Sequence, residues 1–134
     1  MNIIEDYVSF ECAKLLKKKE FNSKCIAYYL EFNGNIKFYE CNDLVQGLPY
    51  ISNDNWGIIL RNPLESGYTA PTLQMAMKWL REVHNLHIIV FYYDNSAFPY
   101  IWYIFAHNRN KPHKANSYEE ACEAAIKYCL ENLI

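Results

Sequence analysis

A repeating pattern of apolar residues in the middle of the chain predicts a helix over residues 71–84. The repeat is spaced by three or four residues and comprises Leu73, Ala76, Met77, Leu80 and Val83. Residues with this spacing share one face of a helix, which can pack against a core. Thr69 or Thr72 can cap the first turn through its hydroxyl, and Asn85 suits the left-handed conformation that often ends a helix.

The residues after this helix predict a β-hairpin at about 86–107. Its first strand, LHIIVFYY, carries apolar side chains on both faces, and its second strand follows the connection DNSAFP, which is of normal length for a hairpin. A strand that is apolar on both faces is typical of a covered position. We therefore expect either a central strand or a strand whose second face is covered by another layer or by a partner chain.

Two further helices are expected, one toward each end of the chain. The first runs from about residue 9 to residue 19, with Glu11 near its start and lysines at its end, where each charge suits the helix dipole. The second covers residues 117–132. It begins with a capping box, because Ser117 is followed three residues later by Glu120.

A second hairpin is expected at about 25–41, ahead of the central helix. Asn33 and Gly34 separate two segments rich in β-forming residues, and both tolerate the positive φ that a type I′ turn requires. Residues 42–69 are then interrupted repeatedly by Asn, Asp, Gly and Pro, and within them only residues 56–60 fit a short strand. This irregular segment is interpreted either as a functional loop or as an insertion.

These elements predict a single α+β domain spanning residues 1–134. The expected order is helix, hairpin, irregular segment, helix, hairpin, helix. The strands are expected to form one mostly antiparallel sheet of four or five strands, with about three helices packed against it. A chain of 134 residues is long enough for one such domain with its own core.

Composition narrows the classes of function. The net charge of −2 disfavours a protein that binds nucleic acid mainly by neutralising phosphates, because such binding needs a basic face. No stretch approaches the roughly 20 apolar residues of a membrane helix, and the acidic N-terminal sequence does not fit a signal peptide. We therefore expect no membrane association.

The five cysteines favour a reducing compartment. Their number is odd and none forms a CxxC pair, so free thiols and a cytoplasmic location are expected. Cys122 and Cys129 lie seven residues apart on the last predicted helix, on its apolar stripe. Packing is therefore preferred to reactivity for both, since burial opposes ionisation of a thiol.

The histidines are weak candidates for a metal site. His84 and His87 have HxxH spacing, but they straddle a predicted helix end, so they lose the shared face that would make them a ligand pair. His107 and His113 flank a polar loop, with Cys41 as a distant third ligand. Ordinary histidines at element boundaries are the preferred interpretation. The chain also contains no GxGxxG, P-loop, GxSxG or HExxH motif. We predict no catalytic, cofactor-binding or metal-binding residue.

The run Lys17, Lys18 and Lys19 allows two interpretations. The preferred one is a solvated helix end, and the alternative is an anion-binding corner.

Aromatic residues in the predicted strands are the most suggestive feature. We predict an interaction surface formed by Tyr92, Tyr93, Trp102 and Tyr103. Aromatic strands can also stack the bases of single-stranded nucleic acid, but such platforms are interleaved with basic residues, and Lys37 stands nearly alone here. Core packing and a protein interface are therefore preferred.

Three segments resemble those of small uncharacterised proteins encoded in phage and integrated-element regions of gut anaerobic bacteria. They are EDYVSFECAKLLKKKEF, APTLQMAMKWLREVHN and SYEEACEAAIKYCLENLI, at roughly residues 5–21, 70–86 and 117–134. The helix-strand-strand-helix order of residues 71–133, with Trp79 in its first helix, is similar to the phage ABA sandwich domain. The resemblance implies a mobile-element origin and an α+β fold, but no activity and no functional residue.

The sequence leaves three hypotheses for the function of the chain. The first is a non-enzymatic accessory protein of a mobile element, which acts through an unknown protein partner or through self-association. The second is a nucleic-acid-binding module, which predicts that its basic residues gather on one face: Lys17, Lys18, Lys19, Arg109, Lys111 and Lys114. The third is a small enzyme with a deep polar pocket in the segment 42–69, although no sequence motif favours an enzyme.

Overall fold

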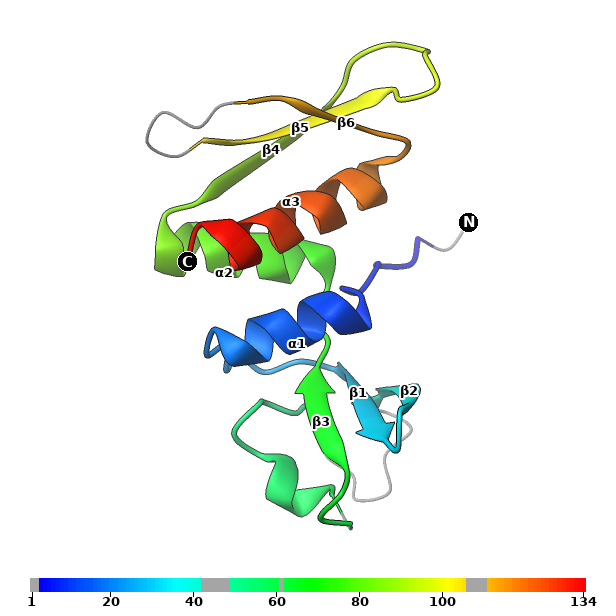
Figure 1. The fold of residues 1–134 in the computed structure, drawn as a ribbon, viewed down its shortest axis with the longest axis vertical. Coiled ribbons are helices and arrows are strands. Elements are labelled where there is room, and N and C mark those ends of the chain that lie inside the picture. The colour runs from blue at the N-terminus through cyan, green and yellow to red at the C-terminus, as the bar shows by residue number, and fades with distance from the viewer. Residues whose placement is uncertain (1–2, 42–48, 61, 106–110) are drawn as a thin grey trace. The chain divides into compact units, whose positions relative to one another are not determined.

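The computed structural model describes residues 3–41, 49–60, 62–105 and 111–134, and it has an α+β fold with antiparallel strands (Figure 1). Its contacts divide the chain into two compact units. Unit 1 comprises Met1–Asp6 and Thr72–Ile134, and unit 2 comprises Tyr7–Pro71.

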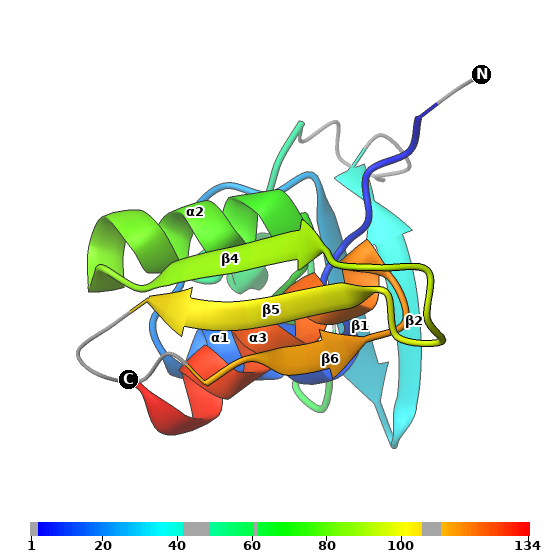
Figure 2. The ribbon, with the colours of Figure 1, turned by 90° about the horizontal axis from the view of Figure 1, so that it is seen from above.

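Unit 1 is a three-stranded sheet with two helices on one face. Its elements in chain order are α2 (Leu73–His84), β4 (His87–Tyr92), β5 (Tyr100–Phe105), β6 (His113–Ala115) and α3 (Tyr118–Asn132). The strand order is β4-β5-β6, and both pairings are antiparallel. Figure 2 shows the three strands in front of α2 and α3, which lie behind them. The sheet of this unit therefore has one covered face and one open face.

Local capping explains where the helices of unit 1 begin and end. The backbone N–H of Met75 donates to the hydroxyl of Thr72, and that of Glu120 donates to the hydroxyl of Ser117. Both donor–acceptor distances are 3.1 Å. Asn85 ends α2 in the left-handed conformation, with φ 54° and ψ 36°. These contacts satisfy backbone groups that the helices leave without partners.

Unit 2 is built around a second three-stranded sheet. Its elements are α1 (Phe10–Lys18), β1 (Ala27–Phe32), β2 (Asn35–Glu40), the 3₁₀ helix η2 (Trp56–Ile58) and β3 (Ser66–Thr69). The strand order is β2-β1-β3, with both pairings antiparallel. Asn33 and Gly34 join β1 to β2 with φ values of 52° and 81°, as expected for a type I′ turn.

The core of unit 2 contains a cluster of aromatic and apolar residues. Tyr28, Cys41, Ile51 and Trp56 are buried together. The ring of Trp56 packs edge-on against Tyr28 at 5.7 Å between centroids, and a short antiparallel bridge joins Cys25 to Ile51. Part of the irregular segment therefore belongs to the hydrophobic core of unit 2.

The α+β class and the predicted order of helices and hairpins are confirmed. The prediction of one sheet with four or five strands is wrong, because the strands form two sheets of three. Two short strands, β3 and β6, were not predicted. The expected short strand at 56–60 is wrong as well, since Trp56–Ile58 is a 3₁₀ helix.

The predicted apolar stripe of the central helix needs one correction. Leu73, Ala76, Met77 and Leu80 are buried, as expected, but the side chain of Val83 is 61% exposed. Successive residues of an α-helix are rotated by about 100°, so Val83 lies to one side of the other four. Of the helices in the described residues, none is long and apolar enough to cross a membrane.

Candidate interaction surface

The register of the β4-β5-β6 sheet determines which side chains share a face. Ile89 pairs with Tyr103, Phe91 with Ile101, and His87 with Phe105. Paired residues in an antiparallel sheet point to the same side, and successive residues alternate. The outer face, which α2 and α3 leave uncovered, is therefore formed by His87, Ile89, Phe91, Ile101, Tyr103, Phe105 and Lys114.

The opposite, inner face is buried at three residues of β5 and β6, on the side of the helices of unit 1. Trp102, Ile104 and Ala115 are between 3% and 8% exposed. The indole of Trp102 stacks on the imidazole of His113 at 4.1 Å and also contacts the ring of Tyr128 in α3 at 6.0 Å. This face is a hydrophobic core and leaves the outer face as the accessible one.

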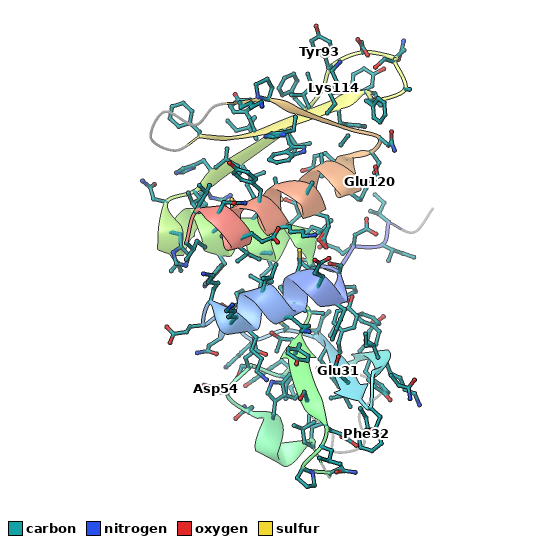
Figure 3. All side chains as sticks on the ribbon, viewed as in Figure 1. Glu31, Phe32, Asp54, Tyr93, Lys114 and Glu120 are labelled. Carbon is teal, nitrogen blue, oxygen red and sulfur yellow. The ribbon has the colours of Figure 1, made fainter. Side chains whose placement is uncertain are left out.

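The outer face exposes large apolar side chains. Phe91 is 40% exposed and Phe105 is 59% exposed. Tyr93 is 61% exposed directly after β4, and Figure 3 shows its side chain on the side of the sheet away from the helices. A shallow hollow of about 450 Å³ is lined by Phe91, Ile101, Tyr103, Phe105 and Pro112.

Few charges accompany these side chains. Lys114 shares the outer face with Ile101, its partner in the register. Beyond the end of β4, Asp94 accepts a hydrogen bond from the backbone N–H of Ser96 at 2.8 Å, and its bonds to Ser96 hold the pKa of its carboxyl below the usual value, with a smaller contribution from Lys114. The outer face is thus apolar with a cation at one margin.

The four residues predicted as an interaction surface fall into different places. Tyr103 lies on the outer face and Tyr93 continues it. Tyr92 is 55% exposed but belongs to the inner-face register, where its ring contacts Tyr100 at 5.6 Å. The prediction that Trp102 belongs to an interaction surface is corrected, because its side chain is 6% exposed and lies in the core of unit 1.

Four apolar residues of the outer face were missed: Ile89, Phe91, Ile101 and Phe105. Their signal was the alternation of residues 89 and 91 along the first strand of the hairpin and of residues 101, 103 and 105 along the second. This signal could not decide between the two faces, because both alternating sets are apolar and only the position of the helices distinguishes them.

His84 and His87 each contact a residue close to them in the sequence. His84 packs against Trp79 at 4.7 Å between ring centroids, and the ring of His87 is hydrogen-bonded to the side chain of Asn85 at 3.0 Å. Burial, followed by the nearby charge of Lys111, lowers the pKa of His113. His107 lies outside the described residues, which contain no cluster of three potential metal ligands.

The cysteines are all free and buried. Burial raises the pKa of Cys25 and of Cys129 to about 12, and that of Cys122 to about 11. A thiol with so high a pKa is protonated at neutral pH, and the thiolate is the nucleophilic form. These three thiols are therefore poor nucleophiles in the folded chain.

The lysine run at the end of α1 is not uniformly solvated. The ammonium of Lys17 donates to the carbonyl of Gly67 at 2.7 Å and lies 4.8 Å from the ring centroid of Tyr68. Lys18 is exposed. The charge of Lys17 is thus directed toward its own unit, which disfavours its use in an anion-binding corner.

The described part of the segment 42–69 lies only partly in the core of unit 2: Ile51, Trp56 and Thr69 are buried, whereas Tyr50 and Leu64 are exposed. Residues 42–48 and 61 lie outside the description. A hollow of about 220 Å³ is lined mostly by β1 and β2, including Leu30, Lys37 and Tyr39, together with Glu65. Glu65 alone of its lining residues belongs to the segment 42–69, so this hollow is not the deep polar pocket within the segment that a small enzyme would require.

No protein-family model matches the chain, and no curated protein or solved structure matches it significantly.

Proposed function

We propose that the chain is a non-enzymatic interaction protein, which binds a partner protein through the outer face. The observation that supports this proposal is the open aromatic face of the β4-β5-β6 sheet, where Phe105 alone is 59% exposed. Contiguous apolar patches that are rimmed by polar groups often mark a binding site for another protein. The cores of such interfaces are rich in aromatic residues and poor in charge, like this face.

The cellular setting is part of the same proposal. The resemblance to proteins of phages and integrated elements suggests an accessory role in a mobile element. Five free thiols support a reducing compartment such as the cytoplasm.

The test is selection from a random peptide library displayed on phage, followed by calorimetric measurement of the selected peptides. Tyr103→Ala and Phe105→Ser are expected to weaken binding at least about 30-fold each, because central interface aromatics typically contribute about 2 kcal/mol or more. Ile36→Ser is a matched control, since Ile36 is 46% exposed on β2 of unit 2. The proposal would be contradicted if the selected peptides bound the wild-type chain and all three variants equally. It would also be contradicted if the selection yielded no peptide.

A second candidate function is the binding of single-stranded nucleic acid. The observation that favours it is Lys114, which lies beside Ile101 on the same face as Phe91 and Tyr103. Aromatic rings can stack bases while cations contact the phosphates. At low salt, fluorescently labelled oligonucleotides should then bind, and Lys114→Glu should weaken that binding at all sequences. Failure of mixed-sequence RNA and DNA to bind at low salt would exclude this function.

A further inference from the structure

We propose that two copies of the chain associate through the edges of β4, which pair antiparallel and join two three-stranded sheets into one of six strands. The edge of β4 is a different surface from the outer face, through which the chain is proposed to bind a partner protein. The two surfaces share the sheet but can be tested separately.

The peptide groups of β4 point alternately toward β5 and toward the open edge. Tyr93 follows β4, and its N–H donates to the carbonyl of Pro99 at 2.7 Å, so this position is a hydrogen-bonded pair. Hydrogen-bonded pairs alternate with non-bonded pairs along an antiparallel ladder. The peptide groups of residues 87, 89 and 91 therefore face β5. Those of Ile88, Val90 and Tyr92 point away from it, to the open edge.

That edge is unoccupied within the described chain. The strand order places β4 at one margin of the sheet. Among residues 3–41, 49–60, 62–105 and 111–134, no backbone hydrogen bond from another segment reaches Ile88, Val90 or Tyr92. Such a row of unpaired donors and acceptors is a template for another strand.

The other three sheet edges carry features that discourage pairing. β2 includes Lys37 and Glu40, while β3 is four residues long and contains Gly67. β6 is three residues long, follows Pro112 and contains Lys114. Charges, proline and short length are the usual means by which proteins protect an edge.

β4 lacks all of these features. Its six residues, HIIVFY, include no Asp, Glu, Lys, Arg, Gly or Pro. Short segments of this composition have a strong tendency to pair with other strands. The edge of β4 is therefore the one on which added pairing is least opposed.

An apolar flank of α2 continues this edge below the sheet. Met75, Trp79 and Val83 are spaced by four residues, so they lie on one flank of the helix. The side chain of Gln74 lies roughly 140° around the helix from Trp79, and it donates to the hydroxyl of Tyr118 in α3 at 3.1 Å. The flank thus faces away from α3. Met75 is 37% exposed and Val83 is 61% exposed, and Figure 2 shows α2 running alongside β4.

A second copy is the occupant that these features fit. In an antiparallel pairing centred on Val90, Ile88 meets Tyr92 of the partner subunit, and each pair can exchange two hydrogen bonds. The same surface faces itself across a two-fold axis, as in most dimers. An edge with charged residues would repel its own copy, but β4 brings no like charges together. The two flanks of α2 would meet below the joined sheet.

The experiment combines the solution mass with amide exchange of the full chain. Light scattering at rising protein concentration is expected to approach twice the mass of one chain. In the same samples, the amides of Ile88, Val90 and Tyr92 should exchange at least tenfold more slowly when the dimer forms. Two variants test the contact: Val83→Glu, which places like charges in the contact, and Tyr92→Pro, which removes an outward N–H that edge strands can spare. Both should remain folded by circular dichroism and lose the dimer.

The control is Phe105→Ser, which changes the outer face on β5 and should still dimerise. A chain that stays monomeric at all concentrations would overturn the proposal. So would a dimer in which the three amides remain unprotected, or one that survives both variants. Protection of these amides by a selected peptide, with the free chain monomeric, would assign the edge to a different partner. If Phe105→Ser loses peptide binding but keeps the dimer, the two functions are distinct.

Discussion

The ring of Trp56 lies directly against the backbone of Gly67. A Cβ atom added at Gly67 would lie 2.7 Å from Cζ3 of the ring, closer than real Cβ atoms approach a neighbour. Trp56 is 7% exposed and packs on Tyr28, so its ring is held in place. Only glycine fits beneath this ring.

Replacing Gly67 with alanine should therefore destabilise unit 2. We expect Gly67→Ala to lower the free energy of unfolding by about 1–3 kcal/mol, the usual cost of overpacking a core. Urea denaturation followed by tryptophan fluorescence provides the measurement. Gly57→Ala is the control, because a Cβ at Gly57 meets nothing within 4 Å, and its effect should stay within about 0.5 kcal/mol. Equal losses in the two variants would contradict this packing.

Lys17 should contribute more to stability than its neighbour. Its ammonium donates to the carbonyl of Gly67 and lies near the rings of Tyr68 and Trp56, at 4.8 Å and 5.8 Å. Lys17→Met keeps the apolar stem but removes these contacts, and it should cost about 1 kcal/mol in urea denaturation. The exposed Lys18→Met variant should change stability by less than about 0.5 kcal/mol. If both variants unfold at the same urea concentration, the ammonium contacts of Lys17 contribute nothing.

The cap of α3 can be tested through Ser117. Its hydroxyl accepts a hydrogen bond from the N–H of Glu120, which otherwise has no partner within the helix. We expect Ser117→Ala to lower the free energy of unfolding by about 1 kcal/mol, while Ser117→Asp, which retains an acceptor, should cost much less. Thermal denaturation of the three proteins makes the comparison. An alanine variant as stable as the aspartate variant would show that this cap is dispensable.

The buried thiols should make the chain less stable in alkaline solution. Below pH 9, which is near the ordinary thiol pKa, the cysteines are protonated in both the folded and the unfolded chain. Between pH 9 and about pH 11 the unfolded thiols ionise, whereas the folded pKa values of Cys25 and Cys129 lie near 12. The unfolded chain then binds fewer protons, so the free energy of unfolding falls as pH rises, by up to about 1.4 kcal/mol per pH unit for each thiol.

Urea denaturation at pH 8, 9 and 10, with a reductant present, measures this slope. Cys129→Ala should be less stable at pH 8 because it leaves a small cavity, but its stability should decline less steeply with pH. Parallel pH profiles for the two proteins would mean that Cys129 ionises equally well in the folded state.

The helices and hairpins could be predicted because their signals are local. Asn33-Gly34 determines a turn through the φ values that its two residues tolerate, and Ser117 determines the start of α3 through a contact three residues away. The weaker elements depend on distant partners. β3, with the sequence SGYT, forms only because it pairs with β1, and β6, with the sequence HKA, forms only against β5.

Of the four residues predicted for the candidate surface, only Tyr93 and Tyr103 belong to it. The cause is again that distant partners decide the structure. Trp102 and Tyr103 are neighbours with similar hydrophobicity, and the sequence offers no means of telling which points to the helices. The packing of α3 and β6 decides this, since Tyr128 and His113 both contact the indole of Trp102. Tyr103 is left on the open side.

The two pairings of β1 should form at very different speeds. β1 meets β2 across a two-residue turn, a contact that forms within microseconds in small hairpins. Its pairing with β3 joins Glu31 to Ser66 and must first close the whole intervening segment, whose entropy cost grows with its length. Unit 2 is therefore expected to fold in two stages: the β1-β2 hairpin forms first, and β3 and Trp56 dock onto it later.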